Sequence, residues 1–171
     1  MRNIIRRLRY FFYAGINILY YRYVFLKYYY YKYKYSSSEF VVLDFDQTLI
    51  NNDFQLNRNL LIHLNKFHRN ALFLILSARL FYHKRIVLNS LGQSIFDFKI
   101  IDVHLIGSTL KKANLVKILA KRNKVTYYDD LDFLGFGSSI ELREQFITNL
   151  KNIDNLNLIT DQELNDIISH H

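Results

Sequence analysis

The sequence predicts an α/β domain built on a parallel sheet, preceded by a basic, aromatic amino-terminal extension. Continuous apolar runs, typical of strands buried on both faces, alternate with segments whose apolar residues recur at helical spacing. Polar residues follow these runs directly, where the carboxyl ends of parallel strands gather ligands. Of the 23 Lys and Arg residues, eight lie in residues 1–38, which contain no acid, so the remaining chain has 15 of each sign.

Length and composition set the limits of the interpretation. A chain of 171 residues can form one domain with a substantial core. Because it has no Cys, disulfides and thiolate metal sites are excluded. The absence of Pro and Trp, together with abundant Tyr, Phe, Ile, Asn, Leu and Lys, suggests a gene under adenine and thymine pressure. Such pressure is typical of organelles, some parasites and some viruses, and among these we expect an organellar, mitochondrial location.

The extension, residues 1–38, interleaves aromatic and basic side chains. Lysine and arginine neutralise phosphates, and tyrosine rings stack on unpaired bases, so RNA or a ribonucleoprotein is the expected partner of residues 1–35. With a single Gly15 and no Pro, much of the extension is expected to be helical. The bases predicted to bind RNA are Arg2, Arg6, Arg7, Arg9, Arg22, Lys27, Lys32 and Lys34.

Other partners of the extension remain open. The uncharged run from Tyr10 to Tyr21 has twelve residues, whereas a membrane span needs about 20. A helix lying in the membrane surface is an alternative, as are an organelle transit peptide and packing on a partner protein. The sequence Ser36-Ser37-Ser38 is expected to form a polar hinge, which places a domain boundary between residues 1–38 and residues 39–171.

The first strand is predicted in the apolar run that starts at Phe40 and ends in two aspartates one residue apart. Alternate side chains of a strand share a face, so Asp44 and Asp46 are expected to point the same way at the strand end. Two carboxylates in one place repel each other unless a cation or a shared proton intervenes. This end of the strand is therefore a candidate site for a metal and a phosphate.

After the first strand, predicted helices and strands alternate along the chain. Helical spacing over residues 56–67 precedes an apolar run at 71–76, which we interpret as a buried strand that ends at Ser77 and is followed by Arg79. A helix is expected over residues 80–91, with Gly92 as its cap, before a strand within residues 96–106. Two aspartates of that stretch, Asp97 and Asp102, are expected to be exposed.

Further along, residues 109–119 predict a helix with lysines near its start, and residues 125–128 predict a short strand that ends at Asp129 and Asp130. Magnesium prefers oxygen ligands, and few protein carboxylates are needed to hold it. A helix to about residue 150, a strand over residues 156–160 and a closing helix to residue 168 complete the domain.

These residues resemble the haloacid dehalogenase (HAD) superfamily, whose first motif is Asp-x-Asp-x-Thr after an apolar strand. Residues 44–48 fit that motif, Ser77 fits the second, a lysine at the start of a helix fits the third, and Asp129 with Asp130 fits the fourth. For the third we choose Lys112, with Lys111 and Lys117 as rivals. The resemblance implies a three-layer, Rossmann-like parallel sheet over residues 39–168.

Within the superfamily, the chain is similar to polynucleotide 3′-phosphatases and RNA-repair enzymes. Those relatives carry Ser-Gly-Arg where this chain has Ser77-Ala78-Arg79. They carry Tyr-Asp-Asp-Arg at the fourth motif, where this chain has Leu131 in place of the arginine. The similarity to this branch is therefore incomplete.

The resemblance also implies roles for the site residues. Asp44 is the expected nucleophile and Asp46 the acid and base, while Thr48 fixes the loop. Ser77 and Lys112 hold phosphoryl oxygens, and Arg79 binds substrate. The expected Mg²⁺ ligands are Asp44, Asp46 through its backbone carbonyl, and Asp129 or Asp130.

Spacing bears on the substrate. About 28 residues separate Thr48 from Ser77 and about 34 separate Ser77 from Lys112, which leaves no room for a cap domain. We therefore expect a phosphatase acting on a macromolecular phosphate, such as a nucleic-acid end. The alternative is a non-catalytic structural protein of an organellar ribosome or another ribonucleoprotein, because fold alone does not decide function.

Overall fold

The computed structural model describes residues 2–51, 53, 55–79, 83–91, 98–131, 140–151 and 153–169, with backbone alone at 2–10, 14, 86, 90, 161 and 162. Its centre is a five-stranded, all-parallel sheet with the order β3-β2-β1-β4-β5. The predicted α/β class is therefore confirmed. The strands are β1 (Glu39–Leu43), β2 (Leu72–Ser77), β3 (Ile100–Leu105), β4 (Lys124–Tyr128) and β5 (Leu156–Ile159).

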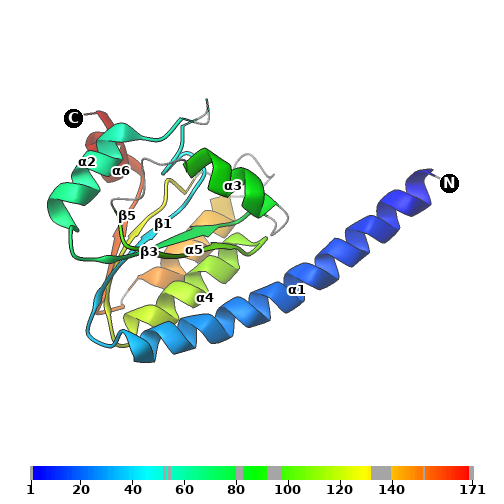
Figure 1. Ribbon diagram of the computed structural model, residues 1–171, viewed down its shortest axis with the longest axis horizontal. Helices are drawn as coiled ribbons and strands as arrows, with labels where there is room; N and C mark the ends of the chain where they lie inside the picture. The colour runs from blue at the N-terminus through cyan, green and yellow to red at the C-terminus, as the bar shows by residue number, and fades with distance from the viewer. Residues whose placement is uncertain are drawn as a thin grey trace.

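Helices cover both faces of the sheet and produce three layers (Figure 1). One core cluster joins α1, α4 and α5 to one face, and the other joins α2, α3 and α6 to the opposite face. Successive side chains of β1 point to opposite faces of the sheet, so Val42 packs in the first cluster and Val41 in the second. The helices are α1 (Arg2–Lys34), α2 (Arg58–Phe67), α3 (Lys84–Leu91), α4 (Thr109–Ala120), α5 (Ile140–Leu150) and α6 (Asp161–Ser169).

The register of the central strands brings their carboxyl ends together. Leu43 of β1 lies opposite Ile75 of β2 on one side and Tyr128 of β4 on the other. The chain adds strands outward on one side of β1 and then crosses to β4 on the other side. The strand order therefore reverses between β1 and β4, the position at which open α/β sheets bind ligands.

Local chemistry sets where α2 and β3 begin. Asn57 caps α2, because its side chain accepts a hydrogen bond from the Leu60 backbone N–H, and the helix therefore starts two residues after the predicted position. Strand β3 starts at Ile100, later than residue 96. The predicted cap at Gly92 and the side chain of Asp97 lie outside the described residues.

The prediction that Asp102 is exposed is wrong. Its side chain is 13% exposed, pairs with the ammonium of Lys27 and accepts a hydrogen bond of 2.8 Å from the Tyr31 hydroxyl. Both partners come from α1, which lies against β3. A buried carboxylate needs such partners, and they are more than 70 residues away in the sequence.

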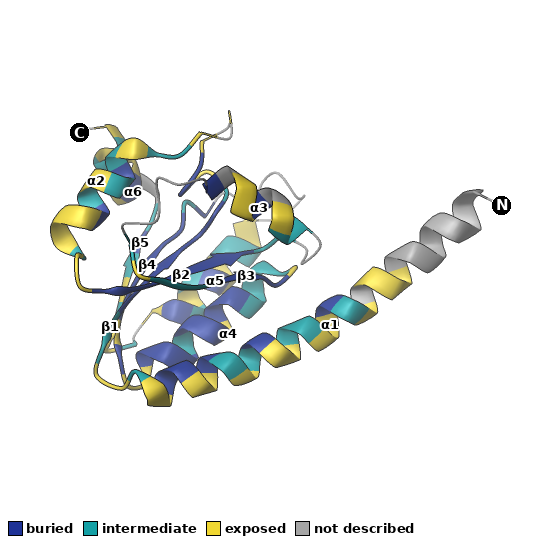
Figure 2. Ribbon diagram, viewed as in Figure 1, coloured by how far each residue is buried: buried dark blue, intermediate teal, exposed yellow. Residues whose placement is uncertain are grey.

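The amino-terminal extension is a helix whose second half belongs to the core (Figure 2). Val24, Tyr28 and Tyr31 are buried in the cluster that contains α4. The turn after α1 lies where we predicted a hinge: Ser37 has φ 66° and donates its N–H to the Arg122 carbonyl at 3.1 Å. Among the described residues, no helix is long and apolar enough to span a bilayer.

His104 of β3 is buried beneath α1. Its Nδ1 lies 3.5 Å from the Tyr20 hydroxyl, and its Nε2 lies 3.4 Å from Asp102 Oδ2. Burial lowers the pKa of His104 to about 4; Asp102 opposes this shift, while Lys27 and Lys84 add to it. The imidazole is therefore neutral at physiological pH.

This burial predicts a loss of stability in mild acid. Between pH 6.5 and 4 the unfolded chain protonates His104 and the folded chain does not, so the free energy of unfolding falls as pH decreases. We expect His104→Gln to remove about 2 kcal/mol of the decrease between pH 7.5 and 5. Urea titrations of both proteins at the two pH values measure it, and equal decreases in both proteins would contradict the prediction.

Candidate metal and phosphate site

Acidic and hydroxyl side chains gather at the carboxyl edge of the sheet. Asp44 follows β1 directly, and its N–H donates to the Tyr128 carbonyl at 2.9 Å. Asp129 and Asp130 follow β4, and Ser77 ends β2. The site is thus assembled by three neighbouring strands at the point where the strand order reverses.

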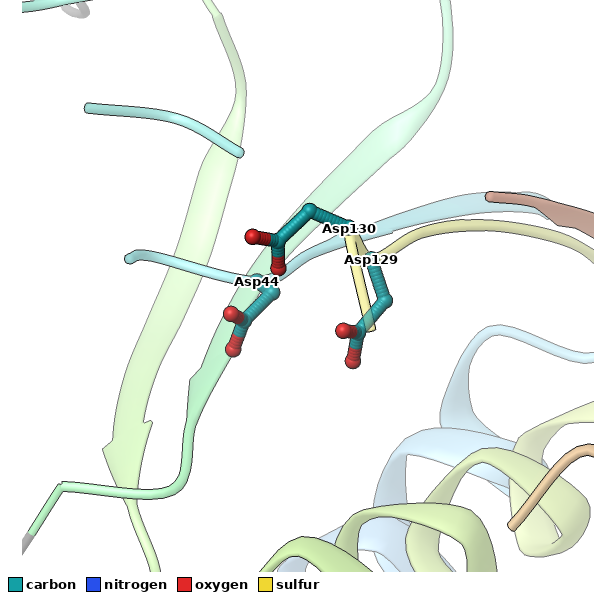
Figure 3. A group of neighbouring side chains, drawn as sticks. All are labelled: Asp44, Asp129 and Asp130. Atoms are coloured by element: carbon teal, nitrogen blue, oxygen red, sulfur yellow. The ribbon is translucent and has the colours of Figure 1, made fainter. Parts of the chain in front are cut away.

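Three carboxylates are close enough to share one cation (Figure 3). One carboxylate oxygen from each of Asp44, Asp129 and Asp130 lies within 4.8 Å of the others. Among the described residues, this is the group of acidic side chains that could hold a metal ion. Octahedral Mg²⁺, with oxygen ligands at about 2.1 Å, places its ligand atoms about 3–4 Å apart. Small side-chain movements, with water as the remaining ligand, would make this group fit Mg²⁺.

Lys112 supplies the positive charge of the site. Its Nζ donates to Asp44 Oδ1 at 2.8 Å and to Asp129 Oδ2 at 2.6 Å. Burial alone would lower the pKa of this ammonium, but Asp129 and Asp44 outweigh burial and raise it. The two rival lysines lie elsewhere: Lys111 lies over the Tyr21 ring and Lys117 contacts Asn149.

Asp129 is held by three donors. Besides Lys112, the hydroxyl of Tyr127 donates to Oδ2 and the Leu131 N–H donates to Oδ1 at 3.0 Å. Tyr127 is not among the site residues expected from the sequence, although it lies two residues before Asp129 and strand alternation places both side chains on one face. Burial, followed by the charge of Asp129, raises the pKa of Tyr127 well above its ordinary value, so its hydroxyl stays protonated and donates.

The charge balance of the site favours a further cation. Burial raises the pKa of Asp44 well above its ordinary range; Lys112 opposes this shift, and Asp129 and Asp130 add to it. Three carboxylates gather here, whereas the one buried ammonium contacts only Asp44 and Asp129. A divalent ion or a retained proton would offset the excess negative charge.

Asp46 lies apart from the three carboxylates. Strand β1 ends at Leu43, and Gln47 has φ 56°, so the alternation expected for a strand does not extend to Asp46. Its carboxylate accepts two hydrogen bonds of 2.9 Å from Nε of Arg79 and one of 2.5 Å from Nη2. Its backbone carbonyl, the predicted metal ligand, accepts from the Thr48 N–H at 2.7 Å.

Two hydroxyl side chains brace the loops of the site. Thr48 is buried, and its Oγ1 accepts from the Asp130 N–H at 3.0 Å, which joins the loop after β1 to the loop after β4. Ser77 is also buried, and its Oγ accepts from the Arg79 N–H at 3.1 Å. The structure therefore places Asp44, Thr48, Ser77 and Lys112 around one edge.

The bases predicted to bind RNA have different surroundings. The side chains of Arg2, Arg6, Arg7 and Arg9 lie outside the description. Arg22 and Lys34 are exposed, whereas Lys27 pairs with Asp102. Lys32 is buried, with its Nζ 5.3 Å and 4.8 Å from the ring centres of Tyr29 and Tyr33.

No protein-family model matches the chain, and no curated protein or solved structure matches it. The described features define an α/β protein with a carboxylate and lysine cluster at the switch point of its sheet. The chemistry of that cluster must therefore indicate the function.

We predict that removing the ammonium strongly destabilises the fold. Lys112→Met leaves Asp44 and Asp129 buried without their cation, and breaking a buried ion pair costs about 3–5 kcal/mol. Urea unfolding at neutral pH without divalent cations measures the loss. The control is Lys121→Met, because Lys121 is exposed and directly follows the same helix. A loss no larger than that of the control would contradict the structural role of Lys112.

Proposed function

We propose that the chain is a magnesium-dependent phosphohydrolase of the HAD type, with Asp44 as its nucleophile. The observation that carries the proposal is the hydrogen-bonded group of Asp44, Lys112 and Asp129 at the switch point of a parallel sheet. The order of the four motifs along the chain supports it too. The HAD-like form of the Rossmann-like fold is part of the same proposal.

The proposed reaction uses side chains already at the edge of the sheet. An oxygen of Asp44 forms a bond to phosphorus while the bond to the ester oxygen breaks, and Asp46 donates a proton to that oxygen. Asp46 then takes a proton from water, which attacks phosphorus, releases phosphate and restores Asp44. Lys112 and Ser77 stabilise the phosphoryl oxygens. Mg²⁺ held by Asp44, Asp129 and Asp130 would supply the positive charge that lets carboxylate and phosphate approach.

Arg79 and Asp46 form a pair that substrate must rearrange. Arginine binds carboxylate and phosphate in the same bidentate manner, so an entering phosphate competes with Asp46 for the guanidinium. Transfer of Arg79 to the phosphate would release Asp46 for its acid and base role. Movement of the Arg79 side chain would thus account both for substrate binding by Arg79 and for the acid and base role of Asp46.

The proposed substrate is a phosphate on a macromolecule, such as a nucleic-acid end. Between Thr48 and Ser77 the described chain contains α2, and between Ser77 and Lys112 it contains α3 and β3. These helices belong to the layers of the sheet, and within the described ranges neither stretch forms a separate domain above the site. An open edge favours a substrate too large to be enclosed.

A second candidate function is a non-catalytic structural protein of a ribonucleoprotein. The observation that favours it is the saturation of the cluster: Lys112 and Tyr127 satisfy Asp129 from within the fold. A buried network of this kind can fix a fold without performing chemistry. Binding of RNA by residues 1–35 belongs to this candidate and stays a prediction.

Nucleophile replacement tests the proposed reaction. We expect Asp44→Asn to reduce Mg²⁺-dependent release of phosphate by at least about a thousandfold, because an amide cannot form the aspartyl-phosphate. Para-nitrophenyl phosphate and a 3′-phosphorylated oligonucleotide are the two substrates. The control is Asp154→Asn, at the opposite edge of the sheet, where Asp154 is exposed. Full activity in Asp44→Asn would overturn the site assignment.

Metal binding gives a second readout that does not depend on activity. We expect the wild-type chain to bind Mg²⁺ and Asp130→Asn to bind it at least about tenfold more weakly, because one oxygen ligand is lost. Isothermal titration calorimetry measures both affinities, again with Asp154→Asn as the control. A wild-type chain that neither binds Mg²⁺ nor hydrolyses either substrate would support the non-catalytic candidate.

A further inference from the structure

One surface is not explained by the proposed site: the solvent-facing side of α1, here called the outer face. Nine large apolar side chains of α1 form it and are 36–70% exposed. From Ile18 onward they follow one another in steps of one, three or four residues, on the side of the helix away from the buried residues Val24 and Tyr28. They are Phe11, Phe12, Ile18, Leu19, Tyr23, Leu26, Tyr29, Tyr30 and Tyr33.

A helix that is apolar on both sides is normally buried on both sides. The inner side of α1 is covered by α4 and β3, whereas the outer face is exposed. A contiguous apolar surface of this length marks an interaction site. A partner of the outer face would have to accept Phe, Leu and Ile side chains.

One basic residue interrupts the outer face. Arg22 is exposed and lies at helical spacing from Ile18, Leu19 and Leu26. The partner of this face must therefore accommodate a guanidinium as well as apolar side chains. An arginine on an apolar face does this at a membrane surface, because its stem contacts apolar groups while its charged head stays at headgroup level.

This distribution favours a lipid surface over RNA. RNA binding requires several bases directed at the backbone, yet of the four basic side chains that the structure describes in α1, Lys27 pairs with Asp102 and Lys32 is buried, which leaves Arg22 and Lys34 exposed. A helix lying in a membrane interface instead has an apolar face, bases around it and tyrosines at headgroup depth. Residues 1–38 contain no acid that would repel anionic lipids.

We propose that the outer face of α1 lies on an anionic lipid bilayer, with the helix axis parallel to the membrane and the α/β domain on the opposite side of the helix. The helix is roughly 50 Å long, so the contact is extended. Tyr20 reaches His104 near the end of β3, and the preceding turns project past the sheet (Figure 1). The projecting part of α1 thus starts at the carboxyl edge of the sheet, which carries Asp44. The proposed membrane contact does not depend on the proposed phosphatase activity.

Vesicle flotation of the full chain tests the proposal. Vesicles of phosphatidylcholine with about 30% phosphatidylglycerol are compared with phosphatidylcholine alone. The variant Leu19→Glu/Leu26→Glu changes two side chains that are 66% and 68% exposed. The control Ile62→Glu/Leu88→Glu introduces the same charge on α2 and α3, at side chains 53% and 47% exposed. Circular dichroism verifies that each protein is folded.

We expect the wild type and the control to float with the anionic vesicles, and the outer-face variant to partition at least about tenfold less. No flotation, or equal flotation of the two variants, would overturn the proposal. So would a wild-type dimer, seen by sedimentation velocity, that the outer-face variant dissociates, since a second copy would then cover the face. Binding of an oligouridine RNA that only this variant loses would assign the face to RNA instead.

Discussion

The fold depends on one buried charge. Lys112 Nζ lies between Asp44 and Asp129, which follow adjacent strands on either side of the point where the strand order reverses. The three groups are almost fully desolvated, so each carboxylate is tolerated only with the ammonium beside it. A slip of β1 against β4 would separate the aspartates. The same interaction therefore sets the strand register, positions α4 and assembles the candidate site.

Much of the fold could be predicted from the sequence because its strands are continuous apolar runs. The stretches around residues 41–43 and 72–76 have no polar face, so a strand buried between two helix layers is the natural interpretation. The packing of α1 was harder to predict. Its tyrosines and lysines look like a solvated binding surface, and only the position of Asp102 and His104 in the sheet reveals that its inner side is part of the core.

The candidate site could likewise be predicted only in part. Residues at the ends of strands, such as Asp44, Ser77 and Asp129, could be located because their positions follow from strand boundaries. Which of Lys111 and Lys112 reaches the site depends on helix phase, which the start of α4 decides. The pairing of Asp46 with Arg79 could not be predicted, because it depends on the left-handed conformation of Gln47 and on a contact between distant loops.

The position of α1 before β3 in the chain also affects how the protein folds during synthesis. The contact of Lys27 with Asp102 spans 75 residues, and that of Tyr20 with His104 spans 84. The ribosome adds about 5–20 residues per second, so the inner side of α1 waits several seconds for β3 to emerge. During this interval both sides of the helix are uncovered. Because this helix precedes the strand on which it packs, its apolar side chains are open to chaperones during translation for longer than those of the helices that follow their strands.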